Sequence, residues 1–144
     1  MERQKVIFPQ LNDKGEIEQE TMWCIKNDIG YIVDNIPFIA KRISLGDIIK
    51  AEYDKLEAAY YFEDFISISG NTTLRIYFHE VELIEKTRRH LNSLGCESEV
   101  FLGKNFIAVN VPKDTGYKFV KEYLDKGEAE GNWTYEESCL AHKY

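Results

Sequence analysis

The second half of the chain constrains the fold most, because residues 72–140 read in the order strand, helix, strand, strand, helix, strand. Residues 73–78 alternate apolar and polar side chains as a half-buried strand does, whereas residues 81–94 carry apolar side chains at helical spacing. Two further strands flank the turn at residues 103–105, and a second helix follows Pro112. Asp114 or Thr115 can cap this second helix, and Gly127 and Gly131 are expected to break it. This order is typical of a split βαβ, or ferredoxin-like, unit.

The preceding part of the chain instead contains short β-like runs separated by turns, and no convincing helix. The clearest hairpin joins residues 22–25 to residues 31–33, and more extended runs follow it. About five strands favour a small closed barrel of an SH3-like kind, since closure removes exposed edges. The expected fold class is therefore α+β, with a small β-barrel domain in residues 1–70 and a ferredoxin-like domain in residues 71–144.

Charge restricts the partners that such a chain can bind. The formal net charge is −7, and Asp plus Glu outnumber Lys plus Arg by 13 to 8 in residues 1–70 and by 12 to 10 after them. Binding to nucleic acid or to an anionic membrane needs a concentrated positive surface, so neither partner is expected. A basic protein partner fits this balance better.

The cellular compartment is predicted from the start of the chain and from the cysteines. The first residues lack the apolar core of a signal peptide, and no run approaches the roughly 20 apolar residues of a membrane span. Cys24, Cys96 and Cys139 lie far apart without a CxxC pair, which favours buried thiols over a disulfide framework or a zinc site. We therefore expect a cytoplasmic protein.

Motifs for catalysis or metal binding are absent from the sequence. His79-Glu80 resembles the start of a zinc-protease helix, but Leu83 stands where the second histidine is needed. We expect His90 to interact with carbonyls near a helix end and His142 to lie in a frayed tail, which leaves no catalytic triad. A further group of acidic residues is expected on a solvated face: Glu128, Glu130, Glu136 and Glu137. The prediction is no enzymatic activity, no cofactor and no metal.

One region combines aromatic and acidic side chains, as protein interfaces do. It lies in two extended runs, residues 48–53 and 60–68. Side chains of the second run are expected to alternate between two faces, and both faces carry aromatic side chains near its start. An ordinary hairpin with a solvated rim has the same pattern. The predicted partner-binding residues are Glu52, Tyr53, Asp54, Tyr60, Tyr61, Glu63 and Asp64.

Several short sequence elements follow one another along the chain. They are Asn35-Ile36-Pro37-Phe38, Leu45-Gly46-Asp47, Ser69-Gly70-Asn71-Thr72 and Gly131-Asn132-Trp133-Thr134-Tyr135. In these elements, residues 20–140 resemble an uncharacterised bacterial family, a domain of unknown function. The resemblance implies a bacterial cytosolic protein and brings no catalytic residues with it.

The leading hypothesis is a non-enzymatic binding protein, most concretely an acidic immunity or antitoxin-like inhibitor that covers the basic active site of a bacterial toxin. The alternative is a regulatory module that binds a small molecule on the ferredoxin-like sheet or at the junction of the two domains. An enzyme whose polar pocket the sequence does not reveal ranks third.

Overall fold

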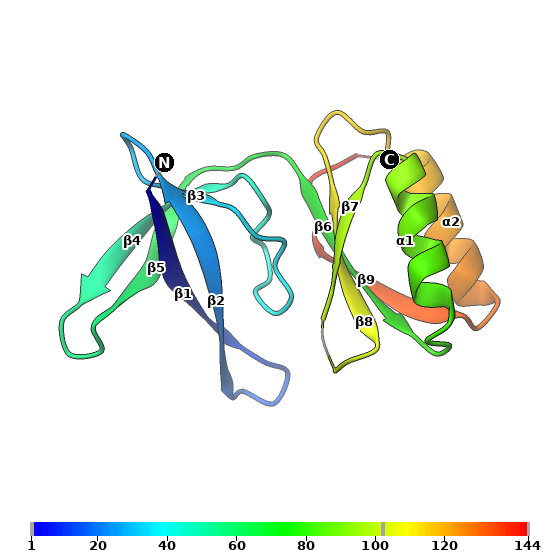
Figure 1. Cartoon of the computed structure of the whole chain (residues 1–144), viewed down its shortest axis with the longest axis horizontal. Coiled ribbons are helices and arrows are strands. Elements are labelled where there is room, and N and C mark those ends of the chain that lie inside the picture. Colours follow the sequence, from blue (N-terminus) through cyan, green and yellow to red (C-terminus); the bar gives the residue numbers. More distant parts are fainter. Residues whose placement is uncertain (1, 102, 144) are drawn as a thin grey trace. The chain divides into compact units, whose positions relative to one another are not determined.

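A computed structural model describes residues 2–101 and 103–143, and the chain divides into two compact units (Figure 1). The first unit is Met1–Ser69 and the second is Gly70–Tyr144. Each unit has a hydrophobic core of its own, as a domain requires, so each is described by itself.

The described part of the first unit is a closed barrel of five strands. The first strand pairs antiparallel with the second and parallel with the fifth, and this parallel pairing closes the sheet on itself. The strands are β1 (Arg3–Leu11), β2 (Ile17–Lys26), β3 (Tyr31–Val33), β4 (Ile48–Asp54) and β5 (Ala59–Ser67). The buried side chains that fill the barrel are Val6, Phe8, Met22, Cys24, Val33, Ala40, Ile43 and Ile49.

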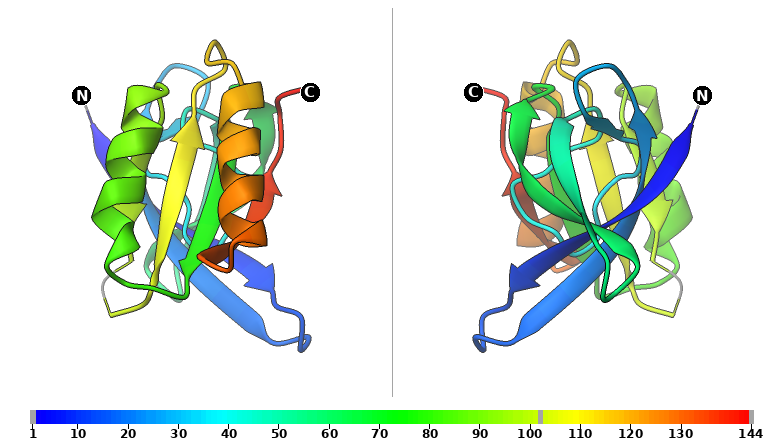
Figure 2. Two further views of the ribbon diagram at one scale, coloured as in Figure 1. Left: turned by 90° about the vertical axis from the view of Figure 1, so that its right-hand side faces the viewer. Right: turned by 90° about the vertical axis from the view of Figure 1, so that its left-hand side faces the viewer.

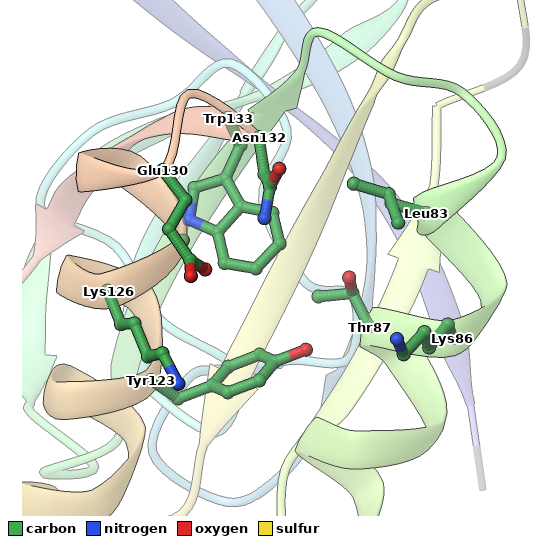
Figure 3. Close-up of a pocket in the computed structure, with 9 residues that line it drawn as sticks. Leu83, Lys86, Thr87, Tyr123, Lys126, Glu130, Asn132 and Trp133 are labelled. Carbon is green, nitrogen blue, oxygen red and sulfur yellow. The ribbon is translucent and has the colours of Figure 1, made fainter.

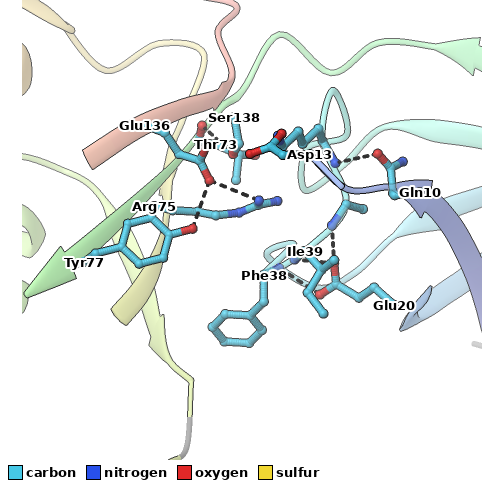
Figure 4. A network of polar contacts seen from close by, with 12 residues as sticks. Gln10, Asp13, Glu20, Phe38, Ile39, Thr73, Arg75, Tyr77, Glu136 and Ser138 are labelled. Carbon is cyan, nitrogen blue, oxygen red and sulfur yellow. Dashed lines mark hydrogen bonds and ion pairs between the residues drawn. The ribbon is translucent and has the colours of Figure 1, made fainter. Parts of the chain in front are cut away.

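Two buried carboxylates hold the long connection between β3 and β4. Glu20, on β2, accepts hydrogen bonds from the backbone N–H groups of Phe38, Ile39 and Ala40 at 2.7, 2.8 and 2.8 Å (Figure 4). Asp47, which is fully buried, accepts from the N–H groups of Ser44 and Ser69, each at 2.9 Å. These bonds satisfy backbone donors that no strand pairs, so two acidic side chains of this unit serve its fold.

The described residues of the second unit form a four-stranded antiparallel sheet in the order β7-β8-β6-β9, with both helices on one face (Figure 2). Its elements are β6 (Thr72–Phe78), α1 (Leu83–Ser93), β7 (Glu97–Val100), β8 (Phe106–Val111), α2 (Lys118–Ala129) and β9 (Trp133–Cys139). Leu74, Ile76 and Phe78 of β6 face the helices and join one core with Leu91 and Leu124. Within the described ranges, no helix has the length and apolar character that a membrane crossing requires.

The fold class predicted from the sequence is wrong. The chain is mostly β, with 44% strand and 16% helix in nine strands and two helices of the described residues. Strand-rich sheets of this kind do not fit an SH3-like barrel followed by a ferredoxin-like unit. The main physical cause is the length of β1 and β2, 9 and 10 residues, where the sequence indicated only short runs interrupted by polar side chains.

The second helix also departs from its prediction. Gly127 was expected to end this helix, but it lies inside α2 because the Trp133 indole occupies the space beside it. A Cβ atom on Gly127 would lie 1.9 Å from the Cζ2 atom of that indole. The helix begins after Tyr117, three and two residues beyond the expected capping residues Asp114 and Thr115. Packing on Trp133 therefore outweighs the low helix propensity of glycine.

Candidate functional site

The seven predicted partner-binding residues lie on the hairpin of β4 and β5, which Figure 1 shows extending from the barrel. Asp54 does not face a partner freely, because its Oδ1 atom accepts hydrogen bonds from the N–H groups of Leu56 and Glu57 at 2.9 and 3.1 Å. Ala58 completes the turn with a positive φ of 53°. Asp54 thus stabilises the turn that joins the two strands.

The strand register divides the other predicted residues between two faces. Tyr53 lies opposite Tyr60, and Glu52 lies opposite Tyr61. Successive side chains of a strand point to opposite faces, so the first pair and the second pair cannot share one surface. The structure therefore does not bring the predicted set together as a single patch.

A β-bulge gathers the acidic side chains on the face of Tyr61. Lys50 pairs with Asp64 while Ala51 pairs with Phe62, so Glu63 is the extra residue of β5. The Lys50 Nζ atom lies 3.5 Å from Glu63 Oε1, across the same face. This acidic face consists of Glu52, Tyr61, Glu63 and Asp64, and its carboxylates are exposed. The strict alternation expected for residues 60–68 is wrong because the bulge interrupts it.

The opposite face of the hairpin is aromatic and belongs largely to the barrel. The Tyr60 ring lies 5.0 Å from Tyr53 and 6.0 Å from Tyr31, and the Phe62 ring lies 5.2 Å from Phe65. Tyr60, Tyr31 and Phe62 pack against the barrel core, and burial raises the pKa of Tyr31. Tyr60 is therefore a structural residue, whereas Tyr53 remains half exposed.

A second candidate site, which the sequence analysis missed, lies between α1 and α2 (Figure 3). It is a groove of about 180 Å³, with Lys86 and Thr87 on α1 facing Tyr123 and Lys126 on α2. Leu83 lies three and four positions before Lys86 and Thr87 on α1, and Tyr123 lies three positions before Lys126 on α2, so the residues form two facing rows. Figure 3 shows the Trp133 indole beneath the space between the rows.

The floor of the groove is held rigidly. Trp133 donates a hydrogen bond from Nε1 to the carbonyl of Leu124 at 3.0 Å, and its ring lies 5.6 Å from Tyr123 and 5.7 Å from Phe78. The His90 imidazole stacks on Tyr123 at 4.0 Å, in place of the carbonyl contact expected for it. The sequence signal for this site is weak: a small residue on each helix and a tryptophan after the second helix.

The densest polar cluster of the second unit joins α2 to β9. Lys121 donates from Nζ to the Tyr135 hydroxyl at 2.7 Å, and that hydroxyl donates to Asp125. Burial, followed by the hydrogen bond to Asp125, raises the pKa of Tyr135 to about 12. The hydrogen bond to Tyr135 also raises the pKa of Lys121. Both groups keep their protons at neutral pH, so this pair is not an activated base.

Three of the four glutamates expected on a solvated face form specific contacts. Arg75 Nη1 and the Tyr77 hydroxyl donate to the same Glu136 oxygen at 3.2 and 3.0 Å (Figure 4). Glu137 accepts from the Tyr117 hydroxyl at 2.6 Å, and Glu128 accepts from the N–H of Tyr135 at 3.1 Å. Sequence reasoning missed these contacts because their partners lie on other elements. These carboxylates form hydrogen bonds that connect β9 to β6 and to the region of α2.

The remaining nucleophiles and histidines also have structural surroundings. Burial raises the pKa of Cys24 to about 12 and that of Cys96 to about 11, so both thiols stay protonated at neutral pH. His142 is not in a frayed tail, because Nδ1 bonds to Thr72 Oγ1 at 2.6 Å and Nε2 bonds to the Pro112 carbonyl at 2.9 Å. Among the residues described, no group of three or more His, Cys, Asp or Glu side chains could hold a metal ion.

Comparison with known proteins identifies a family and a shared fold. A family model described as a domain of unknown function (DUF4265) matches residues 20–135, as the resemblance in the sequence implied. The chain is also similar to a crystal structure described as a hypothetical protein from Neisseria gonorrhoeae, with a TM-score of 0.83, 22% identity and coverage of 99% of both chains. At this identity the likeness shows the fold alone. No curated protein matches the chain.

Proposed function

Because the chain belongs to the DUF4265 family, whose description assigns no activity, we propose a function from the chemistry of its surfaces. The protein is a non-enzymatic inhibitor that binds a basic bacterial toxin in the cytoplasm through the acidic face. The observation that carries this proposal is the β-bulge, which sets Glu63 and Asp64 beside Tyr61 on one exposed face. An aromatic anchor ringed by carboxylates suits a basic protein surface.

The acidic face keeps a net negative charge, because the lysine beside it does not neutralise all of its carboxylates. Lys50 pairs with Glu63, and both side chains are exposed, so the pair contributes little to stability. Glu52 and Asp64 form no ion pair with another described residue. These carboxylates would speed the encounter with a positively charged partner, most strongly at low salt.

The short sequence elements that resemble the family also belong to this proposal. We assign them a role in folding and no role in catalysis. Asn35 accepts a hydrogen bond from the N–H of Trp23 at 2.7 Å, and Asn71 accepts from the N–H of Lys113 at 2.8 Å. Asp47 holds two backbone amides in the same manner. A polar side chain in each of these three elements thus satisfies backbone donors at a turn, which a folding role explains fully.

The test uses a basic protein encoded beside the gene, expressed with and without this protein. We expect protection of the host cell, a stable complex and an association rate that falls steeply with salt. The variant E52Q/E63Q/D64N should slow association about tenfold or more, while E16Q/E18Q, on the tip of the β1–β2 hairpin, removes exposed charge elsewhere and should bind normally. Normal association of the triple variant, or absence of both complex and protection, would contradict the proposal.

A further inference from the structure

The groove between α1 and α2 carries charges of both signs that the fold does not use. Lys86 and Lys126 lie at its rim together with Glu130. None of these three side chains forms an ion pair with another residue of the described ranges. All three side chains are exposed, so their charges are accessible to a ligand in the groove.

The size of the groove restricts its occupant. The groove has a volume of about 180 Å³. Sites for drug-sized ligands and cofactors hold roughly 300–1,000 Å³, so this groove can enclose only a compact molecule.

The chemistry of the walls restricts it further. Figure 3 shows Lys86 and Thr87 on one side of the groove and Glu130 on the other, with the Tyr123 hydroxyl pointing across toward α1. An ammonium and two hydroxyls favour a carboxylate on the α1 side. The Glu130 carboxylate, near the side chain of Asn132, favours an ammonium on the α2 side.

We propose that this groove binds a small free α-amino acid, whose carboxylate pairs with Lys86 and whose ammonium pairs with Glu130. The buried indole of Trp133 gives the side chain of the ligand a short apolar floor. The site lies in the second unit and is independent of the acidic face. It also differs from the sheet and the domain junction, where the sequence analysis expected a small molecule.

Trp133 provides the readout. The chain contains two tryptophans, so W23F leaves Trp133 as the single reporter at the floor of the groove. Titration of this variant with glycine, L-alanine and L-serine should change its fluorescence saturably. Acetate and methylammonium each carry one of the two charges and should bind at least about tenfold more weakly, a loss of about 1.4 kcal/mol. Acetate that binds as tightly as alanine would overturn the assignment of a zwitterion.

Matched substitutions in the W23F background test the two contacts. K86Q and E130Q should each weaken alanine binding about tenfold or more. K118Q on α2 and E97Q on β7 remove the same charges from exposed positions outside the groove and should bind normally. Melting curves without ligand establish that each variant is folded. No saturable response to any of the three amino acids at about 100 mM, far above the concentration of useful binding, or equal weakening by K118Q and K86Q, would overturn the proposal.

Discussion

The two units hold their irregular segments by different physical means. In the first unit, the buried carboxylates of Glu20 and Asp47 accept hydrogen bonds from backbone amides of the β3–β4 connection and its surroundings. In the second unit, the corresponding contact is one of shape, since the Trp133 indole fits against a glycine of α2. Buried charge therefore stabilises an irregular segment of the first unit, whereas steric fit stabilises the end of α2 in the second.

The largest effect is expected from Glu20→Ala. It leaves the N–H groups of Phe38, Ile39 and Ala40 without their acceptor, and each unsatisfied buried donor costs about 1–3 kcal/mol. We expect a loss of about 4 kcal/mol in unfolding free energy, given some access of water to the connection. Hydrogen exchange should accelerate most in peptides of the first unit.

The matched control for Glu20→Ala is Glu18→Ala, on the same strand. Glu18 is exposed and accepts one exposed hydrogen bond, from Asn12. Its removal should change the unfolding free energy by less than about 1 kcal/mol. Equal losses from the two variants would mean that the buried carboxylate does not stabilise the first unit in the way described.

Gly127→Ala should have the next largest effect, and it tests steric fit in the second unit. The added methyl group would overlap the Trp133 indole, whose buried position leaves little room to move. We expect a loss of about 3 kcal/mol, at the upper end of typical overpacking costs. Gly116→Ala is the control, because a Cβ atom there meets nothing within 4 Å. An unchanged melting temperature for Gly127→Ala would contradict the steric account.

Local patterns in the sequence predicted several elements correctly. The hairpin of residues 22–25 and 31–33 is confirmed by the pairing of Cys24 with Val33, and the apolar spacing of the first helix is confirmed by the burial of Ile84, Thr87 and Leu91. Periodicity succeeds there because neighbours along the chain determine the pattern.

The errors arise where a distant residue decides the outcome. The bulge at Glu63 depends on the register of β5 against β4, and the burial of Glu20 depends on a connection about 18 residues away in the chain. Gly127 is helical because Trp133 packs on it, although glycine favours a break. The acidic face and the groove both depend on such contacts. Composition therefore indicated an acidic and aromatic region, but not which of its side chains share a face.

The acidic face offers a comparison within the first unit, between exposed and buried carboxylates. E52Q/E63Q/D64N removes three exposed charges and one surface ion pair, worth about 0–1 kcal/mol. We expect the unfolding free energy to change by less than about 1 kcal/mol, measured by urea denaturation. A loss as large as that of Glu20→Ala would show that these carboxylates serve the fold, which would count against their use in binding a partner.

The smallest effect concerns the second unit at alkaline pH. The pKa of Tyr135 is raised from 10.0 to about 12 in the folded state, so the folded chain keeps a proton that the unfolded chain releases. Its stabilising contribution is complete below pH 10 and is lost as the pH rises from about 10 toward 12.

The measurement is the urea midpoint of the W23F protein, followed by Trp133 fluorescence. This midpoint should be lower at pH 11 than at pH 8, because pH 11 lies above the pKa of roughly 10 that a free tyrosine has. Tyr135→Phe should remove most of this fall, because it removes the raised tyrosine pKa together with the hydrogen bond that raises the pKa of Lys121. The control is Tyr53→Phe, on the exposed hairpin, whose urea midpoint should fall as much as that of the parent protein. An equally large fall for Tyr135→Phe would show that the proton on Tyr135 does not stabilise the second unit.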